Sequence, residues 1–151
     1  MQQAKKSYLN AFKHVTETCK GSFRLTGGCL LVEEVPKEEL KSASGLILAP
    51  STRHQIDSME DNRPMEVRVL VVGEGYYDPE TGKDTPLDTH AGDILLVGKL
   101  SVKWLSSIAG VFLQEGSTRI GLVQESETQF QYLGQEGFDK FGQTLREGMT
   151  K

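Results

Sequence analysis

The sequence predicts a small, mainly β fold of the barrel type. Short apolar runs rich in β-branched residues recur along the chain, glycines separate them, and no sustained helical pattern lies between them. Parallel α/β sheets need such intervening helices, so this spacing favours a barrel or a sandwich. The 151 residues, 37% of them hydrophobic and 25% charged, suffice for one domain with one core.

The first segment, residues 1–22, is expected to be an extension ahead of the barrel. It carries apolar residues at helical spacing, which predicts a short amphipathic helix before Gly21; these are Tyr8, Leu9, Phe12 and Val15. Two alternatives stay open. A frayed tail is one, because short isolated helices are marginal in water, and a mitochondrial presequence is the other, because the stretch is basic and poor in acids.

Charge is distributed unevenly along the chain. Residues 1–27 carry five basic side chains against Glu17 alone, a net +4, which leaves −8 for the rest of a chain whose net charge is −4. An acidic body disfavours nucleic-acid binding, and the basic lead lacks clustered arginines and interleaved aromatic residues. No apolar run approaches the roughly 18 residues that span a bilayer, and no secretory signal is evident. We therefore expect a soluble cytoplasmic protein with no nucleic-acid or membrane partner.

Two strands are expected on either side of a long irregular segment. Cys29–Val35 is an apolar run that ends at Pro36, and Met65–Val72 has the strongest β-branched signature of the chain. Residues 36–64 between them show no sustained periodicity. Loops of this length are uncommon in compact domains and are usually functional or disordered.

An exposed hairpin is predicted at residues 73–86. Gly73 and Gly75 close the preceding strand, and Asp78-Pro79 and Thr81-Gly82 supply turn residues. Further short strands follow at 94–97, 102–105, 110–113, 119–123 and 130–133. The barrel therefore covers residues 23–134.

The last segment, residues 135–151, is expected to form a short helical extension. Phe138, Phe141 and Leu145 have helical spacing, although three interspersed glycines weaken the pattern.

No catalytic or metal-binding motif is evident in the sequence. The three histidines lie far apart without carboxylates or cysteines at ligand spacing. Cys19 and Cys29 lack the spacing of a zinc site and are expected to be free or core thiols. Gly73-Glu74-Gly75 lacks the third glycine and the following helix of a phosphate loop, so a turn is favoured. We therefore expect a non-enzymatic protein with no cofactor and no metal.

One motif in the long loop is not explained by packing patterns. Gly45 precedes the apolar triplet Leu46-Ile47-Leu48, which lies within a polar stretch punctuated by proline and serine. Such a triplet either packs into its own core or is held for the groove of a partner. Periodicity alone leaves both possibilities open.

These motifs together resemble the GroES-type co-chaperonins. Lys41-Ser42-Ala43-Ser44-Gly45 before an apolar triplet is similar to the mobile loop of that family. The later motifs follow in the same order: Val67–Val72 with Gly73-Glu74-Gly75, the hairpin at 76–85, Pro86-Leu87, Gly92-Asp93-Ile94-Leu95-Leu96, and Glu125-Ser126-Glu127.

The resemblance implies a seven-membered ring of β barrels that caps a GroEL-type group I chaperonin and encloses a chamber for protein folding. It assigns chaperonin binding to Gly45, Leu46, Ile47 and Leu48, and the roof hairpin to Tyr76, Tyr77, Asp78 and Glu80. The partner chaperonin, not this chain, uses ATP and Mg. The alternative function is that of a GroES-like barrel serving as a structural or scaffold module without chaperonin binding.

Departures from the family pattern indicate a divergent member, phage-encoded or a second bacterial copy. Leu25-Thr26-Gly27-Gly28 stands in place of the usual Pro-Leu-x-Asp, and the segments 49–64 and 100–116 are longer than usual. Both terminal extensions are additional.

Overall fold

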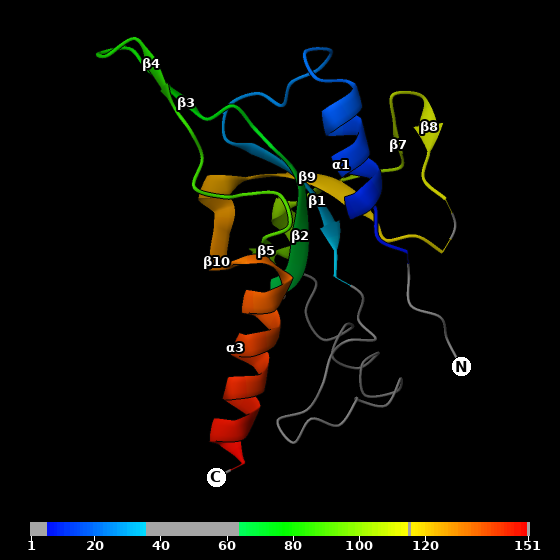
Figure 1. The fold of residues 1–151 in the computed structure, drawn as a ribbon, viewed down its shortest axis with the longest axis vertical. Coiled ribbons are helices and arrows are strands. Elements are labelled where there is room, and N and C mark those ends of the chain that lie inside the picture. Colours follow the sequence, from blue (N-terminus) through cyan, green and yellow to red (C-terminus); the bar gives the residue numbers. More distant parts are fainter. Residues whose placement is uncertain (1–5, 36–63, 115, 151) are drawn as a thin grey trace.

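The computed structural model describes residues 6–35, 64–114 and 116–150, which form a mostly β structure with a helix near each end (Figure 1). The strands are β1 (Cys29–Glu34), β2 (Pro64–Val72), β3 (Tyr76–Asp78), β4 (Lys83–Thr85), β5 (Ile94–Gly98), β6 (Lys103–Leu105), β7 (Ser107–Ile108), β8 (Val111–Phe112), β9 (Ile120–Gln124) and β10 (Thr128–Tyr132). The helices are α1 (Leu9–Thr18) and α3 (Gly134–Met149), with 3-10 turns at Lys99–Ser101 and Glu125–Glu127.

Six strands form one antiparallel sheet in the order β10-β5-β2-β1-β9-β6. The other four form two separate hairpins, β3–β4 and β7–β8. The predicted mainly β fold is confirmed. Within the described ranges β10 and β6 are the edges of the sheet, so closure into a barrel stays a prediction.

The central strands are buried on both faces, which explains why their sequences are continuously apolar. One face supports the larger core, formed by Leu30, Val32, Val67, Val69, Leu87, Leu95, Val97, Val102 and Val123. The opposite face carries Leu31, Leu70, Val71 and Ile120. Because the side chains of a strand alternate between faces, burying both requires apolar residues at consecutive positions.

The helix α1 covers this second face. Tyr8, Leu9 and Phe12 pack against the smaller core together with residues of the segment from Leu105 to Leu113. The apolar residues whose spacing predicts a helix therefore lie on the side of α1 that contacts the sheet. Packing supplies the stability that a ten-residue helix lacks by itself.

The helix α3 is 16 residues long and lies in the segment for which the sequence predicts a helical extension. Aromatic rings fix it to β10: the Tyr132 ring lies 5.2 Å from both Phe138 and Phe141, and Phe130 lies 5.4 Å from Phe141. Edge-to-face aromatic pairs of this kind contribute about 0.5 to 1.5 kcal/mol beyond area burial. They offset the low helix propensity of the interspersed glycines.

Candidate functional site

The attachment points of the predicted mobile loop lie side by side at one end of the sheet. β1 and β2 are antiparallel neighbours up to the pair Glu34–Val67, and the Val35 amide donates a hydrogen bond to the Glu66 carbonyl oxygen at 3.1 Å. Residues 36–63 therefore leave from and return to adjacent strands. The predicted chaperonin-binding residues Gly45, Leu46, Ile47 and Leu48 lie outside the described residues, so their role stays a prediction.

A buried carboxylate holds this end of the sheet together. Glu33 is 0% exposed, and it accepts hydrogen bonds from the Tyr8 amide at 2.6 Å, the Thr118 hydroxyl at 2.7 Å and the Arg68 guanidinium at 3.1 Å, as well as from the Ser7 hydroxyl. Arg68 also donates to the Gln135 side chain at 2.7 Å, at the start of α3. One network thus joins β1, β2 and both helices next to the loop attachment.

A second charged pair lies beside the first. The Arg119 guanidinium donates two hydrogen bonds to Glu34 Oε2, at 3.1 and 3.2 Å, and its backbone amide donates to Glu34 Oε1. The same guanidinium stacks on the Trp104 ring at 4.2 Å. Contacts to both oxygens orient a carboxylate as well as attract it, so this pair fixes the last residue of β1.

The predicted hairpin is present as β3–β4, at the opposite end of β1 and β2 from the loop attachment (Figure 1). Tyr76 pairs with Thr85, and the Asp78 carboxylate accepts the Glu80 amide at 2.9 Å in the turn. Tyr77 is 65% exposed. The structure therefore brings Tyr76, Tyr77, Asp78 and Glu80 together on one exposed projection, and their assignment to a roof stays a prediction.

Glycines allow the base of this hairpin to pack closely. A Cβ at Gly28 would overlap the Tyr76 ring, and one at Gly75 would overlap the Thr85 carbonyl group. Gly75 also has a φ of +103°, a backbone conformation that residues with a side chain rarely adopt. The amides of Gly73 and Gly75 donate to the carbonyl oxygens of Cys29 and Gly27, so the predicted Gly-Glu-Gly turn is tied to the start of β1 and to the residues just before it.

The Gly-Asp turn before β5 serves as an anchor for α3. Asp93 is buried, and its carboxylate accepts the His90 amide and the Gln131 side chain at 2.9 Å and the Gly134 amide at 3.0 Å. Gly134 is the first residue of α3, where backbone amides lack partners within the helix. Asp93 therefore joins the end of β10 to the start of α3.

Glu66 is a carboxylate beside the loop attachment with a clearly raised pKa. Burial raises the pKa of its side chain from 4.5 to about 7, and its Oε2 atom is buried without a hydrogen-bond partner among the described residues. Burial, and next the charge of Glu66, raise the pKa of Tyr132 as well. The loop attachment thus contains one carboxyl group that is easily protonated.

The described residues contain no group of three or more His, Cys, Asp or Glu side chains able to hold a metal ion. Both cysteines are free, as expected. Among the same residues, no helix has the length and hydropathy needed to cross a membrane.

Sequence reasoning missed the roles of Glu33 and Asp93. A charge inside the apolar run of β1 was the available signal for Glu33, because a carboxylate at a fully buried strand position requires donors. The sequence indicates only a turn at Asp93, because its contact with Gly134 joins residues 41 positions apart.

Comparison with known proteins places the chain in a family. No protein-family model matches it. It is 40% identical over 80 residues to co-chaperonin GroES 2 of Mesorhizobium japonicum, an alignment that covers 53% of this chain and 67% of the relative. It is 41% identical over 80 residues to the co-chaperonin GroES of Rhizorhabdus wittichii and 39% identical over 80 residues to that of Zymomonas mobilis, each covering 53% of this chain and 74% of the relative.

These relatives are co-chaperonins, which is the class of protein that the mainly β fold and its ordered motifs indicate. The chain belongs to the GroES co-chaperonin family, as a divergent member that aligns over about half of its own length. Relatives of this class imply a non-enzymatic protein.

Proposed function

We propose that the protein is a co-chaperonin that caps a GroEL-type group I chaperonin ring and assists ATP-dependent protein folding. The observation that carries the proposal is the identity of about 40% to GroES co-chaperonins over 80 residues. The adjacent attachment of residues 36–63 to two paired strands supports it, because a binding loop needs a rigid base. The chain itself requires no cofactor, and ATP and Mg serve the partner.

In this proposal, Gly45, Leu46, Ile47 and Leu48 make the contact with the chaperonin. Burying each aliphatic side chain in an apolar groove contributes about 1.5 to 3 kcal/mol. Ordering the backbone costs about 1 to 2 kcal/mol per residue, so one loop binds weakly by itself. Copies joined in a ring bind together at high effective concentration, which makes the assembly tight while each contact stays reversible.

The ring is therefore part of the mechanism. We propose a heptamer of closed barrels in which the β3–β4 hairpins, carrying Tyr76, Tyr77, Asp78 and Glu80, form the roof above the chamber. The loops attach at the opposite end of the sheet from these hairpins, as a cap with a closed top and a binding rim requires.

The experiment compares Ile47→Ser with Ile56→Ser, which removes the same side chain from the same segment outside the triplet. Ile47→Ser should weaken each loop contact by a factor of about 10 to 150, which corresponds to the burial of one aliphatic side chain. Summed over a ring, this loss abolishes measurable binding to a group I chaperonin in the presence of ATP. Surface-immobilised chaperonin measures the binding.

Ile56→Ser should bind as the original protein does, and both variants should keep the original native mass. Equal loss of binding in both variants would contradict the assignment of the contact to the triplet. A lower unfolding temperature of Ile47→Ser alone would place Ile47 in the core. Intact assembly of the unmodified protein without binding to any group I chaperonin of its host would favour the scaffold alternative.

A further inference from the structure

A partly buried carboxyl group lies on the face of the sheet that α3 covers. Glu66 of β2 pairs with Leu96 of β5, and Leu96 pairs with Phe130 of β10. Directly paired residues of an antiparallel sheet point to the same face, and so do residues two positions apart on one strand. Glu66 therefore shares a face with Phe130 and Tyr132. Aromatic contacts with these two rings fix α3 to that face.

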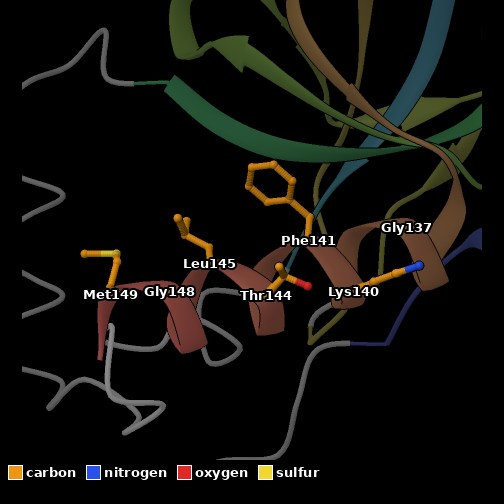
Figure 2. Close-up of a pocket in the computed structure, with 7 residues that line it drawn as sticks. All are labelled: Gly137, Lys140, Phe141, Thr144, Leu145, Gly148 and Met149. Carbon is orange, nitrogen blue, oxygen red and sulfur yellow. The ribbon is translucent and has the colours of Figure 1, made fainter. Parts of the chain in front are cut away.

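The aromatic residues of α3 reach towards the same region. Figure 2 shows the Phe141 ring pointing from the helix towards the start of β2. The rings of Phe138 and Phe141 each lie 5.2 Å from that of Tyr132. The charge of Glu66 is one of the causes that raise the pKa of Tyr132, so the carboxyl group is within electrostatic range of the ring that holds the helix.

The Glu66 carboxyl group has no hydrogen-bond donor or counter-charge among the residues that the structure describes. Its Oε2 atom is buried without a partner. Arg68 lies two residues further along the same face, but its guanidinium is bound to Glu33 at 3.1 Å and to Gln135 at 2.7 Å. The cation next to Glu66 on its own strand is therefore already engaged.

The other elements around this carboxyl group supply no cation to it either. β5 has no titratable side chain, and Tyr132 is the only one on β10. On α3, the Lys140 side chain extends along the helix towards Gly137 (Figure 2). The Asp139 carboxylate accepts a hydrogen bond from the Gln135 side chain at 3.0 Å.

Ionisation of Glu66 therefore has a cost that protonation removes. Burial raises the pKa of its side chain from 4.5 to about 7. A neutral carboxyl group is tolerated in apolar surroundings, whereas a carboxylate without a partner is costly there. Ionisation thus favours any conformation that brings water to Glu66. Release of α3 is the least costly route, because none of its residues is fully buried and no strand ladder has to open.

The start of α3 is built as a hinge. The Asp93 carboxylate accepts the Gly134 amide at 3.0 Å, and Arg68 donates to Gln135 at 2.7 Å, so the first turn is tied to the sheet. Gly134 has a φ of +76°, a conformation that glycine adopts readily. Beyond this turn, aromatic contacts hold the helix on β10. The helix can therefore leave the sheet without losing its attachment.

We infer that α3 is a hinged cover whose docking on β10 depends on a proton held by Glu66. With the proton bound, the carboxyl group is neutral and the aromatic residues of α3 pack on the sheet. When the proton passes to solvent, the carboxylate draws in water, and the helix beyond its first turn leaves the sheet. The inference stands apart from chaperonin binding, because it concerns the sheet and the helix of one chain.

The test is amide hydrogen exchange of the full-length protein at about pH 5.5 and about pH 8.5, with rates corrected for the intrinsic effect of pH. Protection in the part of α3 after its first turn should fall at the higher pH, with a midpoint near 7. The fall has an upper limit of about 300-fold, set by the difference between 4.5 and about 7. A released helix cannot keep its protection, because short isolated helices are marginal in water.

Two variants of Glu66 remove the charge. Glu66→Gln should keep α3 protected at both pH values, and Glu66→Leu, which matches the apolar surroundings, should do the same. Glu136→Gln is the matched control, because it removes an exposed carboxylate from α3 itself and should leave the pH effect unchanged. Phe141→Ala should expose α3 at both pH values and gives the exchange rate of a released helix.

Three results would overturn the inference. Equal protection of α3 at both pH values in the original protein would mean that Glu66 ionises beneath a docked helix. The same loss in the original protein and in both Glu66 variants would assign the effect to another group. A loss in β2 and β5 as large as that in α3 would indicate opening of the sheet instead of release of the helix.

Discussion

Replacement of Glu33 by glutamine should destabilise the fold strongly. The carboxylate is fully buried and accepts hydrogen bonds from four groups, one of them the buried guanidinium of Arg68 at 3.1 Å. Glutamine leaves this cation without its anion among the described residues, and it turns one acceptor into a donor that faces other donors. Removing one partner of a buried ion pair costs about 3 to 5 kcal/mol. That is a large part of the roughly 5 to 15 kcal/mol that stabilises a typical domain.

Urea unfolding at a fixed protein concentration measures this loss. Trp104 is the only tryptophan of the chain and stacks on Arg119, so its fluorescence reports unfolding close to the network. With a urea dependence of about 2 kcal/mol per molar, the midpoint should fall by roughly 1.5 to 2.5 M.

Glu74→Gln is the matched control for this experiment. Its ion pair with Arg24 spans 3.5 Å, and both side chains are exposed, so the loss should stay below about 1 kcal/mol. Equal shifts of the midpoint in the two variants would refute the reasoning, since burial would then make no difference to the cost.

Three further predictions concern the hairpin, the loop attachment and α3. Gly75→Ala should lower the free energy of unfolding by about 1 to 3 kcal/mol, because the new side chain is strained and overlaps Thr85. Gly82→Ala should lower it less, because a Cβ there meets nothing within 4 Å. Equal urea midpoints of the two variants would contradict this. Burial raises the pKa of Glu66 to about 7, so the folded protein retains a proton that the unfolded chain releases above pH 4.5. Stability should therefore fall as pH rises from about 4.5 to 7, and Glu66→Gln should remove that fall in urea titrations across this range; an unchanged slope would exclude Glu66 as its source. Asp93→Asn should lower the free energy of unfolding by about 1 to 3 kcal/mol and speed amide hydrogen exchange in the first turn of α3. Unchanged exchange at Gly134 would show that the carboxylate does not anchor the helix.

The strands with strong local signals were predictable from the sequence. The β-branched run up to Val72 is β2, and the turn residues around Asp78 and Gly82 form the β3–β4 hairpin. In both cases the local pattern and the tertiary environment favour the same conformation.

Elements that depend on distant contacts were predicted less well. The helical spacing of Phe138 and Phe141 predicts α3, but the packing of both rings on Tyr132 is a contact that no helix propensity contains. β7 was missed because two residues, Ser107 and Ile108, carry no periodicity, and only their pairing across the Ala109-Gly110 turn makes them a strand. The apolar groove between Phe12 of α1 and Phe112 of β8 depends on that same hairpin, so no sequence pattern indicated it.

The candidate site likewise has parts that the sequence predicted and parts that only the folded chain shows. The motif order predicted the family, which the relatives confirm. The residues assigned to chaperonin binding, Gly45 to Leu48, fall in the segment outside the described residues, so that assignment rests on the resemblance. The networks of Glu33 and Asp93 join residues far apart in sequence, and only the folded chain brings them together.

The most direct test of the central claim is electron microscopy of the protein mixed with a group I chaperonin from its own host and ATP. The proposal predicts chaperonin particles with a dome at one or both ends, present with the original protein and absent with Ile47→Ser. Uncapped chaperonin particles beside intact rings of the original protein would contradict the claim that this chain works as a co-chaperonin.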